Sequence, residues 1–136
     1  MIDRGKVDIL GIGIDVVDYE AAVHRIITAA HDQRPYGVSA LAVHGVMTGA
    51  DDPDHAARLN QLDLVTPDGQ PVRWAMNLLH HAGLRDRVYG PKLTLLVCQA
   101  AAEQGLPVYF YGSNDKVLAH LRDRLPGLAP GIQIAG

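Results

Sequence analysis

Two proton-accepting residues, His44 and Asp68, each follow an apolar run. His44 comes after "SALAV" and Asp68 after "LDLVTP". If these runs are parallel strands, both residues lie at the carboxyl edge of the sheet, where open α/β sheets bind ligands. A carboxylate or an imidazole at that edge suits general base catalysis. The segment "PDGQP" is also good turn chemistry, and spacing alone favours a turn-forming role for Asp68 over a base.

The segment "YGSNDK" is a candidate phosphate site. Gly112 and Ser113 connect an expected strand to an expected helix, and Asn114 is the expected N-cap. Backbone N–H groups in such a turn can bind phosphate, although a plain strand-to-helix connection fits equally well. The earlier "GIGIDV" begins like a dinucleotide fingerprint but lacks its third glycine, so we interpret it as a β-turn or hairpin.

Metal-binding patterns are weak in this sequence. Asp52-Pro53-Asp54 matches a DxD motif, but an N-cap at Asp52, a helix start at Pro53 and a first-turn acid at Asp54 explain all three residues. The seven histidines show neither a His-Glu-x-x-His pattern nor zinc-like pairing with cysteine. We therefore predict no metal and no cofactor.

The composition excludes several classes of protein. The 136 residues carry a formal net charge of −3, which argues against binding nucleic acid. A single cysteine, Cys98, cannot form an intramolecular disulfide and fits a reducing compartment. The sequence shows neither a signal-peptide pattern nor an apolar run of bilayer-spanning length. We expect a cytoplasmic protein.

Four β-rich runs alternate with helical patterns. The expected strands are residues 7–14, 37–43, 62–67 and 107–112. Apolar residues at helical spacing follow Asp18, Pro71, Pro91 and Asn114, with Gly105 and Pro126 as expected stops. The alternation predicts one α/β domain over residues 1–136, a Rossmann-like, open, mostly parallel sheet with flanking helices.

The last residues, "GIQIAG", form a further expected strand with no helix after it. Open α/β sheets normally cover such a strand. We therefore expect a domain that is incomplete at its C-terminus, or completed by another chain in a homo-oligomer.

Taken together, these segments resemble the WecG/TagA/CpsF family of bacterial glycosyltransferases (glycosyltransferase family 26). The opening "VDILGIGIDVVDYEAAVHRI" is similar to the family's first strand, turn and helix. The block "DDPDHAARLNQLDLVTPDGQPVRWAMNLL" resembles its most diagnostic region. The segment from "LRDRVYGPKL" to the C-terminus is similar to the following helix, strand and loop. The likeness covers nearly the whole chain.

The resemblance implies an inverting transfer of an N-acetylmannosamine-type or related sugar, without an obligatory metal. The donor would be a UDP-sugar and the acceptor lipid-diphosphate-linked or a saccharide, in cell-surface polysaccharide synthesis. Asp68 matches the proposed general base, and Arg87 matches an arginine that stabilises diphosphate charge. We add Gly69 and Gln70, which follow the base, to Gly112 and Ser113 as substrate-binding candidates.

The sequence departs from the family pattern at three points. His44 stands where the family usually has Asn, and it is the alternative base. Lys92 replaces a frequent acid in "GPKL". Intact members continue with a Gly-x-Pro-x-Gln-Glu-like segment and often a membrane-contacting tail, so peripheral contact with the inner face of the membrane is expected of residues beyond these. The alternative function is a non-catalytic, truncated relic that keeps a nucleotide pocket or oligomerises.

Overall fold

The computed structural model describes all 136 residues. The chain divides into two compact units, Met1–Leu93 and Thr94–Gly136. The α/β class predicted from the sequence is confirmed, because the chain combines six helices with six strands. The open, mostly parallel sheet is only partly evident, since the strands form one antiparallel and two parallel pairs. The prediction of a single domain stays a prediction.

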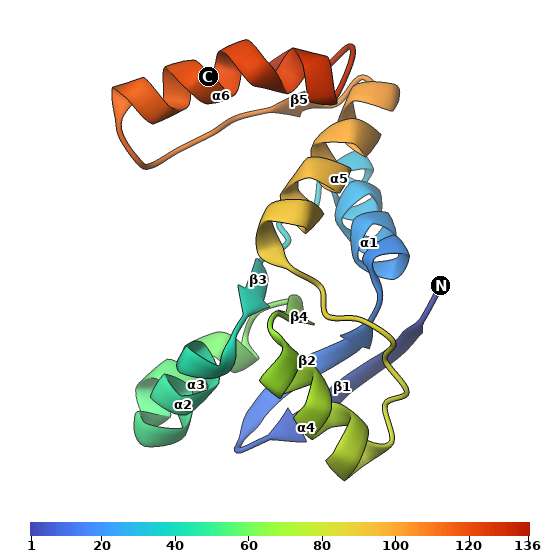
Figure 1. Cartoon of the computed structure of the whole chain (residues 1–136), viewed down its shortest axis with the longest axis vertical. Coiled ribbons are helices and arrows are strands. Elements are labelled where there is room, and N and C mark those ends of the chain that lie inside the picture. Colours follow the sequence, from blue (N-terminus) through green and yellow to red (C-terminus); the bar gives the residue numbers. More distant parts are fainter. The chain divides into compact units, whose positions relative to one another are not determined.

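Unit 1 begins with a β-hairpin. Strands β1 (Asp3–Ile9) and β2 (Ile12–Val17) pair antiparallel, and Ile9 lies opposite Ile12. The two turn residues, Leu10 and Gly11, have φ of 54° and 86°, as a tight hairpin turn of the primed type requires. The hairpin expected from "GIGIDV" is therefore confirmed, whereas a single strand over residues 7–14 is wrong. Helix α4 (Gln70–His80) lies along this hairpin (Figure 1).

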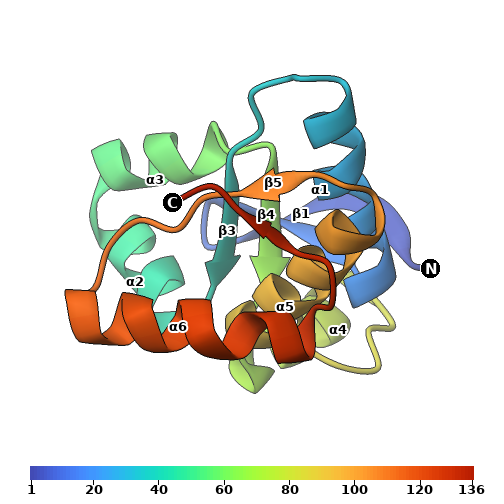
Figure 2. The same cartoon turned by 90° about the horizontal axis from the view of Figure 1, so that it is seen from above.

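Strands β3 (Val38–Leu41) and β4 (Leu64–Pro67) run parallel, side by side (Figure 2). Their register pairs Val38 with Leu64 and Leu41 with Pro67. All four residues of β4 are buried, as expected of a strand covered on both faces. The hairpin is tied to β4 by the buried Asp15 of β2, which accepts a 2.8 Å hydrogen bond from the Val65 N–H.

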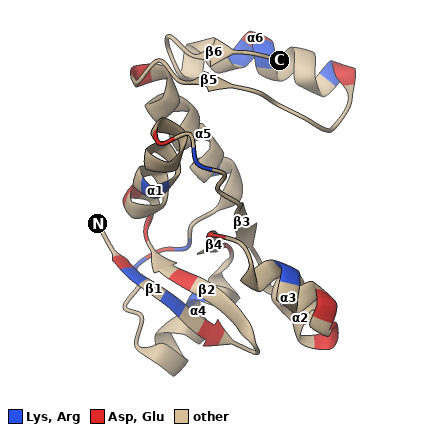
Figure 3. Ribbon diagram, turned by 180° about the vertical axis from the view of Figure 1, so that it is seen from behind, with Lys and Arg blue, Asp and Glu red and all other residues tan.

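Two helices of unit 1 begin at side-chain caps, as the sequence predicts. Asp18 caps α1 (Tyr19–His31) and accepts from the N–H of Ala21 at 2.9 Å. Asp52 caps α3 (Pro53–Asn60) and accepts from Asp54 N–H at 2.9 Å. Acidic residues gather where α2 (Val43–Asp51) meets α3 (Figure 3). The first helical turns thus receive the negative charge that stabilises them.

Helix α2 was not predicted. Its N-cap, Ala42, offers no side-chain acceptor, and two glycines lie inside the helix, so its local signals are weak. Packing explains it instead. A Cβ at Gly49 would lie 2.6 Å from Ile12 Cδ1 and 3.2 Å from Leu59 Cδ1, so a larger residue there would require these two side chains to shift.

The core of unit 1 joins the hairpin, the β3–β4 pair and α4. Its largest members are buried aliphatic and thioether side chains. They include Ile12, Ile14, Val65, Val72 and Met76. Burying each such side chain contributes about 1.5–3 kcal/mol to the stability of unit 1.

Unit 2 holds most of α5 (Gly90–Glu103), then β5 (Pro107–Val108), α6 (Asp115–Leu128) and β6 (Gln133–Ile134). The strands β5 and β6 are parallel, which makes a small strand–helix–strand unit. Hydrogen bonds of 2.8 Å from Ala135 N–H to Val108 O and from Phe110 N–H to Gly136 O extend the ladder. The strand expected in "GIQIAG" is confirmed, and the one expected over residues 107–112 is shorter than predicted.

Helix α6 continues past its expected stop. Pro126 lies inside the helix, which ends at Leu128. A proline in the last turn loses one backbone hydrogen bond, and the helix still closes because Ala129 N–H bonds to Leu125 O at 2.8 Å. Leu125 and Ala129 are buried with Cys98 in the core of unit 2, so packing holds this turn in place.

Candidate functional site

The carboxyl edge of the β3–β4 pair carries Asp68, as the sequence predicts. The backbone N–H of Asp68 donates to the carbonyl oxygen of Leu41 at 3.1 Å, which extends the parallel ladder by one residue. His44 lies at the same edge, at the second position of α2, with its side chain exposed. The structure thus brings the two candidate bases to one edge, on a buried frame that positions them.

The Asp68 carboxylate is half-buried and has a protein partner. Its Oδ2 accepts a hydrogen bond from the backbone N–H of Gly90 at 3.2 Å, at the first residue of α5. The N-cap of α4 is Gly69, with no side-chain cap bond. Asp68 therefore does not cap α4, the helix that follows it directly, and its partner lies 22 residues along the chain at the start of α5.

Gly69 and Gln70 have clear structural tasks. Gly69 has φ of 91° and ψ of 146°, a conformation that side-chain-bearing residues rarely adopt. The Gln70 Oε1 accepts from Nε of Arg73 at 2.7 Å, and Arg73 donates on to the carbonyl oxygens of Leu84 and Arg85, both at 3.0 Å. These contacts hold the segment that leads to Arg87. A substrate contact for either residue stays a prediction.

Thr66 is a polar residue that sequence reasoning missed. It is fully buried in β4, and its Oγ1 has no hydrogen-bond partner. Because strand side chains alternate between faces, Thr66 points to the same side of β4 as Asp68, two residues on. In the sequence, Thr66 is marked only by its hydroxyl group, which lies within the mostly apolar run of residues 62–67.

Arg87 lies beside the same edge. The next residue, Val88, donates its N–H to the carbonyl oxygen of Pro67 at 2.8 Å, which fixes this segment against the end of β4. The Arg87 side chain is half-buried, and its guanidinium carbon lies 4.7 Å from the centroid of the Tyr89 ring. Arg87 and Asp68 therefore flank one bonded pair of backbone segments, and their chemical roles stay predictions.

Tyr19 and Lys92 complete this part of the site. The Lys92 Nζ lies 4.5 Å from the centroid of the Tyr19 ring. The Tyr19 hydroxyl oxygen accepts a hydrogen bond from the N–H of Tyr89 at 2.8 Å. Cation–ring contacts of this length are favourable. Tyr19 and Tyr89 were not among the predicted site residues, because neither belongs to a short motif.

A cavity of about 200 Å³ opens next to Arg87. Aliphatic and aromatic side chains form most of its wall, with charged residues of both signs at its rim. The lining residues are Ile2, Asp18, Tyr19, Leu84, Arg85, Asp86, Arg87 and Val88. This space suits an apolar group joined to an anion.

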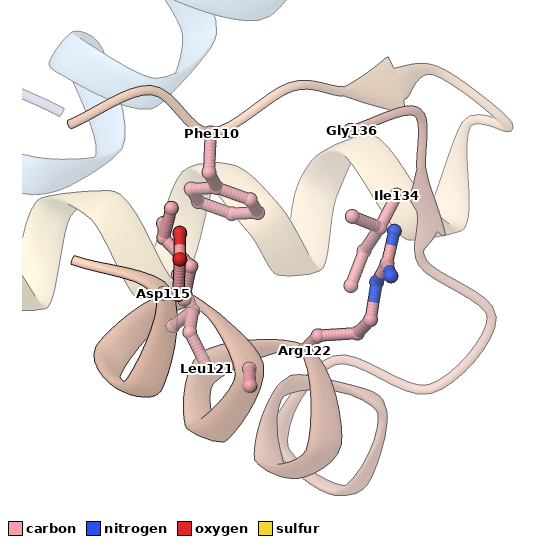
Figure 4. A pocket seen from close by; sticks show the side chains of 8 residues that line it. Phe110, Asp115, Leu121, Arg122, Ile134 and Gly136 are labelled. Carbon is pink, nitrogen blue, oxygen red and sulfur yellow. The ribbon is translucent and has the colours of Figure 1, made fainter. Parts of the chain in front are cut away.

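Gly112 and Ser113 lie in unit 2, just before α6. Both have positive φ, 113° and 61°, and both are exposed. Asn114 caps α6 as predicted, accepting from Val117 N–H at 3.1 Å. A cavity of about 270 Å³ lies nearby, lined by α6 and the β5–β6 segment, where Arg122 reaches toward Ile134 (Figure 4). Phosphate contact by Gly112 and Ser113 stays a prediction.

The acidic pair at α3 acts as the capping interpretation predicts. Asp52 Oδ1 accepts from the N–H groups of Asp54 and His55 at 2.9 and 3.2 Å, and these bonds lower the pKa of the Asp52 carboxyl. No group of three or more His, Cys, Asp or Glu side chains is placed to hold a metal ion. No helix has the length and apolarity needed to cross a membrane.

Comparison with known proteins identifies the class. The model of the glycosyl transferase WecG/TagA/CpsF family matches residues 7–136. The chain belongs to this family. A curated relative from Bacillus spizizenii, named N-acetylglucosaminyldiphosphoundecaprenol N-acetyl-beta-D-mannosaminyltransferase, is 32% identical over 85 residues, which cover 62% of this chain and 33% of that protein. The chain thus spans about a third of the length of the curated relative it matches.

Proposed function

We propose that this chain forms part of an inverting glycosyltransferase. It would transfer an N-acetylmannosamine-type or related sugar from a UDP-sugar to a lipid-diphosphate-linked sugar acceptor in the synthesis of cell-surface polysaccharide. The family supports sugar transfer, and the name of the Bacillus spizizenii relative supports the sugar and the acceptor. The observation that carries the proposal is the placement of the Asp68 carboxylate and the Arg87 guanidinium beside one edge of β4.

The proposed reaction is a single displacement. Asp68 takes the proton of the acceptor hydroxyl while that oxygen attacks the anomeric carbon of the donor sugar. The bond between this carbon and the UDP oxygen breaks, and the electron pair leaves with UDP. The Arg87 guanidinium offsets the charge on the leaving diphosphate, since its several N–H donors match spread-out negative oxygens.

Two further assignments complete the proposal. Gly112 and Ser113 offer backbone N–H groups to phosphate, and Gly69 and Gln70 contact substrate while shaping the loop after β4. His44 is the alternative base, because its imidazole can accept a proton and the residue lies at the same edge. The reaction would take place in the cytoplasm at the inner face of the membrane, where a lipid-linked acceptor is accessible.

The test is UDP release from a panel of UDP-sugars, with short-chain prenyl-diphosphate-linked N-acetylglucosamine as acceptor. We expect release that requires both substrates and is lost in Asp68→Asn. The matched control is Asp123→Asn, since Asp123 is exposed on α6. If the chain bound UDP but released no UDP from any UDP-sugar, the proposed transferase activity would be contradicted. That result would favour a non-catalytic nucleotide-binding chain.

A further inference from the structure

Two positive charges lie on linked aromatic supports next to the Asp68 edge. Arg87 stacks over the ring of Tyr89 at 4.7 Å, and Lys92 stacks over the ring of Tyr19 at 4.5 Å. The 2.8 Å hydrogen bond from Tyr89 N–H to the Tyr19 hydroxyl joins the two pairs. The rings therefore hold the two cations in one region of unit 1.

Neither cation is neutralised by the protein. Arg87 and Lys92 take part in none of the ion pairs of the structure, and Lys92 is exposed while Arg87 is half-buried. A contact with a ring face leaves the N–H groups of a cation free to donate to an anion. The ring also restricts the long side chain, so binding an anion costs less conformational entropy.

The first two residues of α5 offer no free backbone N–H group to a ligand. Asp68 accepts from the first N–H, at Gly90, and Pro91 has no N–H. An anion at this end is therefore attracted mainly by the Lys92 ammonium and the Arg87 guanidinium. The Lys92 and Arg87 side chains are long enough to contact separate charged groups of one ligand.

The acids near the cavity are already engaged. Asp18 accepts from the N–H groups of Ile2 and Ala21 at 2.7 and 2.9 Å. Asp86 Oδ1 accepts from the N–H of Arg87 at 2.8 Å. These bonds offset part of their charge, and Arg85 adds a further cation to the rim.

We propose that Lys92 and Arg87 together bind a diphosphate ester, and that the group esterified to it enters the adjoining cavity. Two separate cations match the spread negative charge of two phosphoryl groups. A cavity of about 200 Å³ is smaller than a typical small-molecule site, so it receives only part of the ligand. Lys92 is then a substrate-binding residue at a position where the family often has an acid.

This inference rests on the proposed function, which has two substrates with a diphosphate. One is the nucleoside diphosphate of the donor and the other is the prenyl diphosphate of the acceptor. The aliphatic wall formed by Ile2, Leu84 and Val88 is chemically suited to a prenyl group, and the Tyr19 ring is suited to either. Measuring the two ligands separately assigns the source.

The experiment is a titration of the chain with UDP, farnesyl diphosphate and inorganic pyrophosphate by calorimetry. We expect Lys92→Gln to weaken at least one of the two esters about tenfold, the size of one charge-assisted hydrogen bond. Lys92→Arg should restore binding to within about threefold. Arg58→Gln, which removes an exposed charge on α3, should leave all three affinities unchanged. The ester that loses affinity is the ligand of the site.

The inference would be overturned if Lys92→Gln bound UDP with the same affinity as the unchanged protein and also bound farnesyl diphosphate with the same affinity as the unchanged protein. An equal loss of affinity in Arg58→Gln would overturn it too, because the loss would then come from the change in net charge and not from a site at Lys92. Thermal melting confirms that each variant folds. Because binding is measured without turnover, Lys92-dependent binding with no sugar transfer would contradict only the proposed function. Transfer by Lys92→Gln with unchanged kcat and KM would contradict only this inference.

Discussion

The Asp68 carboxylate accepts a hydrogen bond from the backbone N–H of Gly90 across 22 residues of chain, at 3.2 Å. The bond ties the end of β4 to the start of α5. The acceptor is Oδ2. This oxygen thus orients the carboxylate. Gly90 is suited to this contact, since a Cβ there would lie 3.3 Å from the Ala40 Cβ and 3.5 Å from Asp68 Oδ2.

Asp68→Asn separates the two roles of this residue. The amide oxygen can still accept from Gly90 N–H, so the free energy of unfolding should fall by less than about 1 kcal/mol. The amide cannot take a proton, so turnover should fall by about 10²–10⁴-fold with little change in UDP-sugar affinity. Steady-state UDP release and urea unfolding measure the two effects. Near-normal turnover together with a lower melting temperature would make Asp68 a structural residue and His44 the first candidate base.

Gly69→Ala should destabilise the loop after β4. With φ of 91° and ψ of 146°, Gly69 occupies a region that is nearly closed to alanine, although space for the methyl group exists. Such strain costs about 1–3 kcal/mol. Gly127→Ala is the control, because this glycine lies in α6 with open space around it and alanine favours helix there. Equal unfolding midpoints for the two variants in urea would contradict the strain.

Local features of the fold could be predicted because their causes lie within a few residues. Asp18, Asp52 and Asn114 were predicted as caps, and each bonds to an N–H two or three residues ahead. Asp68 and His44 were placed at one sheet edge because each follows an apolar run. Their chemical roles are a different matter and stay predictions.

Distant partners explain what could not be predicted. Asp15 reads as one acid in a hairpin, yet it is 2% exposed and its acceptor role depends on Val65, 50 residues away. Helix α2 depends on the packing of Gly49, since its own sequence provides no cap. The partner of Asp68 is Gly90 in another helix. Periodicity and spacing do not encode such contacts.

Transfer activity should not depend on a divalent metal. The Asp52 carboxylate already accepts two backbone N–H groups as the cap of α3, so little of its charge is available to an ion. We expect the same rate of UDP release with EDTA as with Mg²⁺. Asp52→Asn, which keeps a capping oxygen, should also match the unchanged protein. Loss of activity in EDTA that Mn²⁺ restores would show that the DxD motif does bind metal.

The buried Asp15 should contribute most of the stability of the hairpin connection. It accepts from Val65 N–H at 2.8 Å and from Arg25 Nη1 at 2.9 Å. Asp15→Ala leaves a buried N–H unpaired and removes one partner of Arg25, which should lower the free energy of unfolding by about 3–5 kcal/mol. Asp3→Asn is the control in urea unfolding, because the more exposed Asp3–Arg25 pair contributes at most about 1 kcal/mol. A loss below that of the control would contradict the assignment.

The Asp3–Arg25 pair gives a pH dependence with a definite sign. Hydrogen bonding to Arg25 lowers the pKa of the Asp3 carboxyl in the folded chain. A lowered pKa means that the folded state favours the carboxylate, so this stabilisation is fully present above the unfolded pKa of about 3.9. It is lost as the pH falls through the folded pKa. The difference in melting temperature between the unchanged protein and Asp3→Asn should be constant from pH 7 to 5 and should shrink toward pH 2. A difference that stayed constant down to pH 2 would show that the charge of Asp3 makes no contribution to stability.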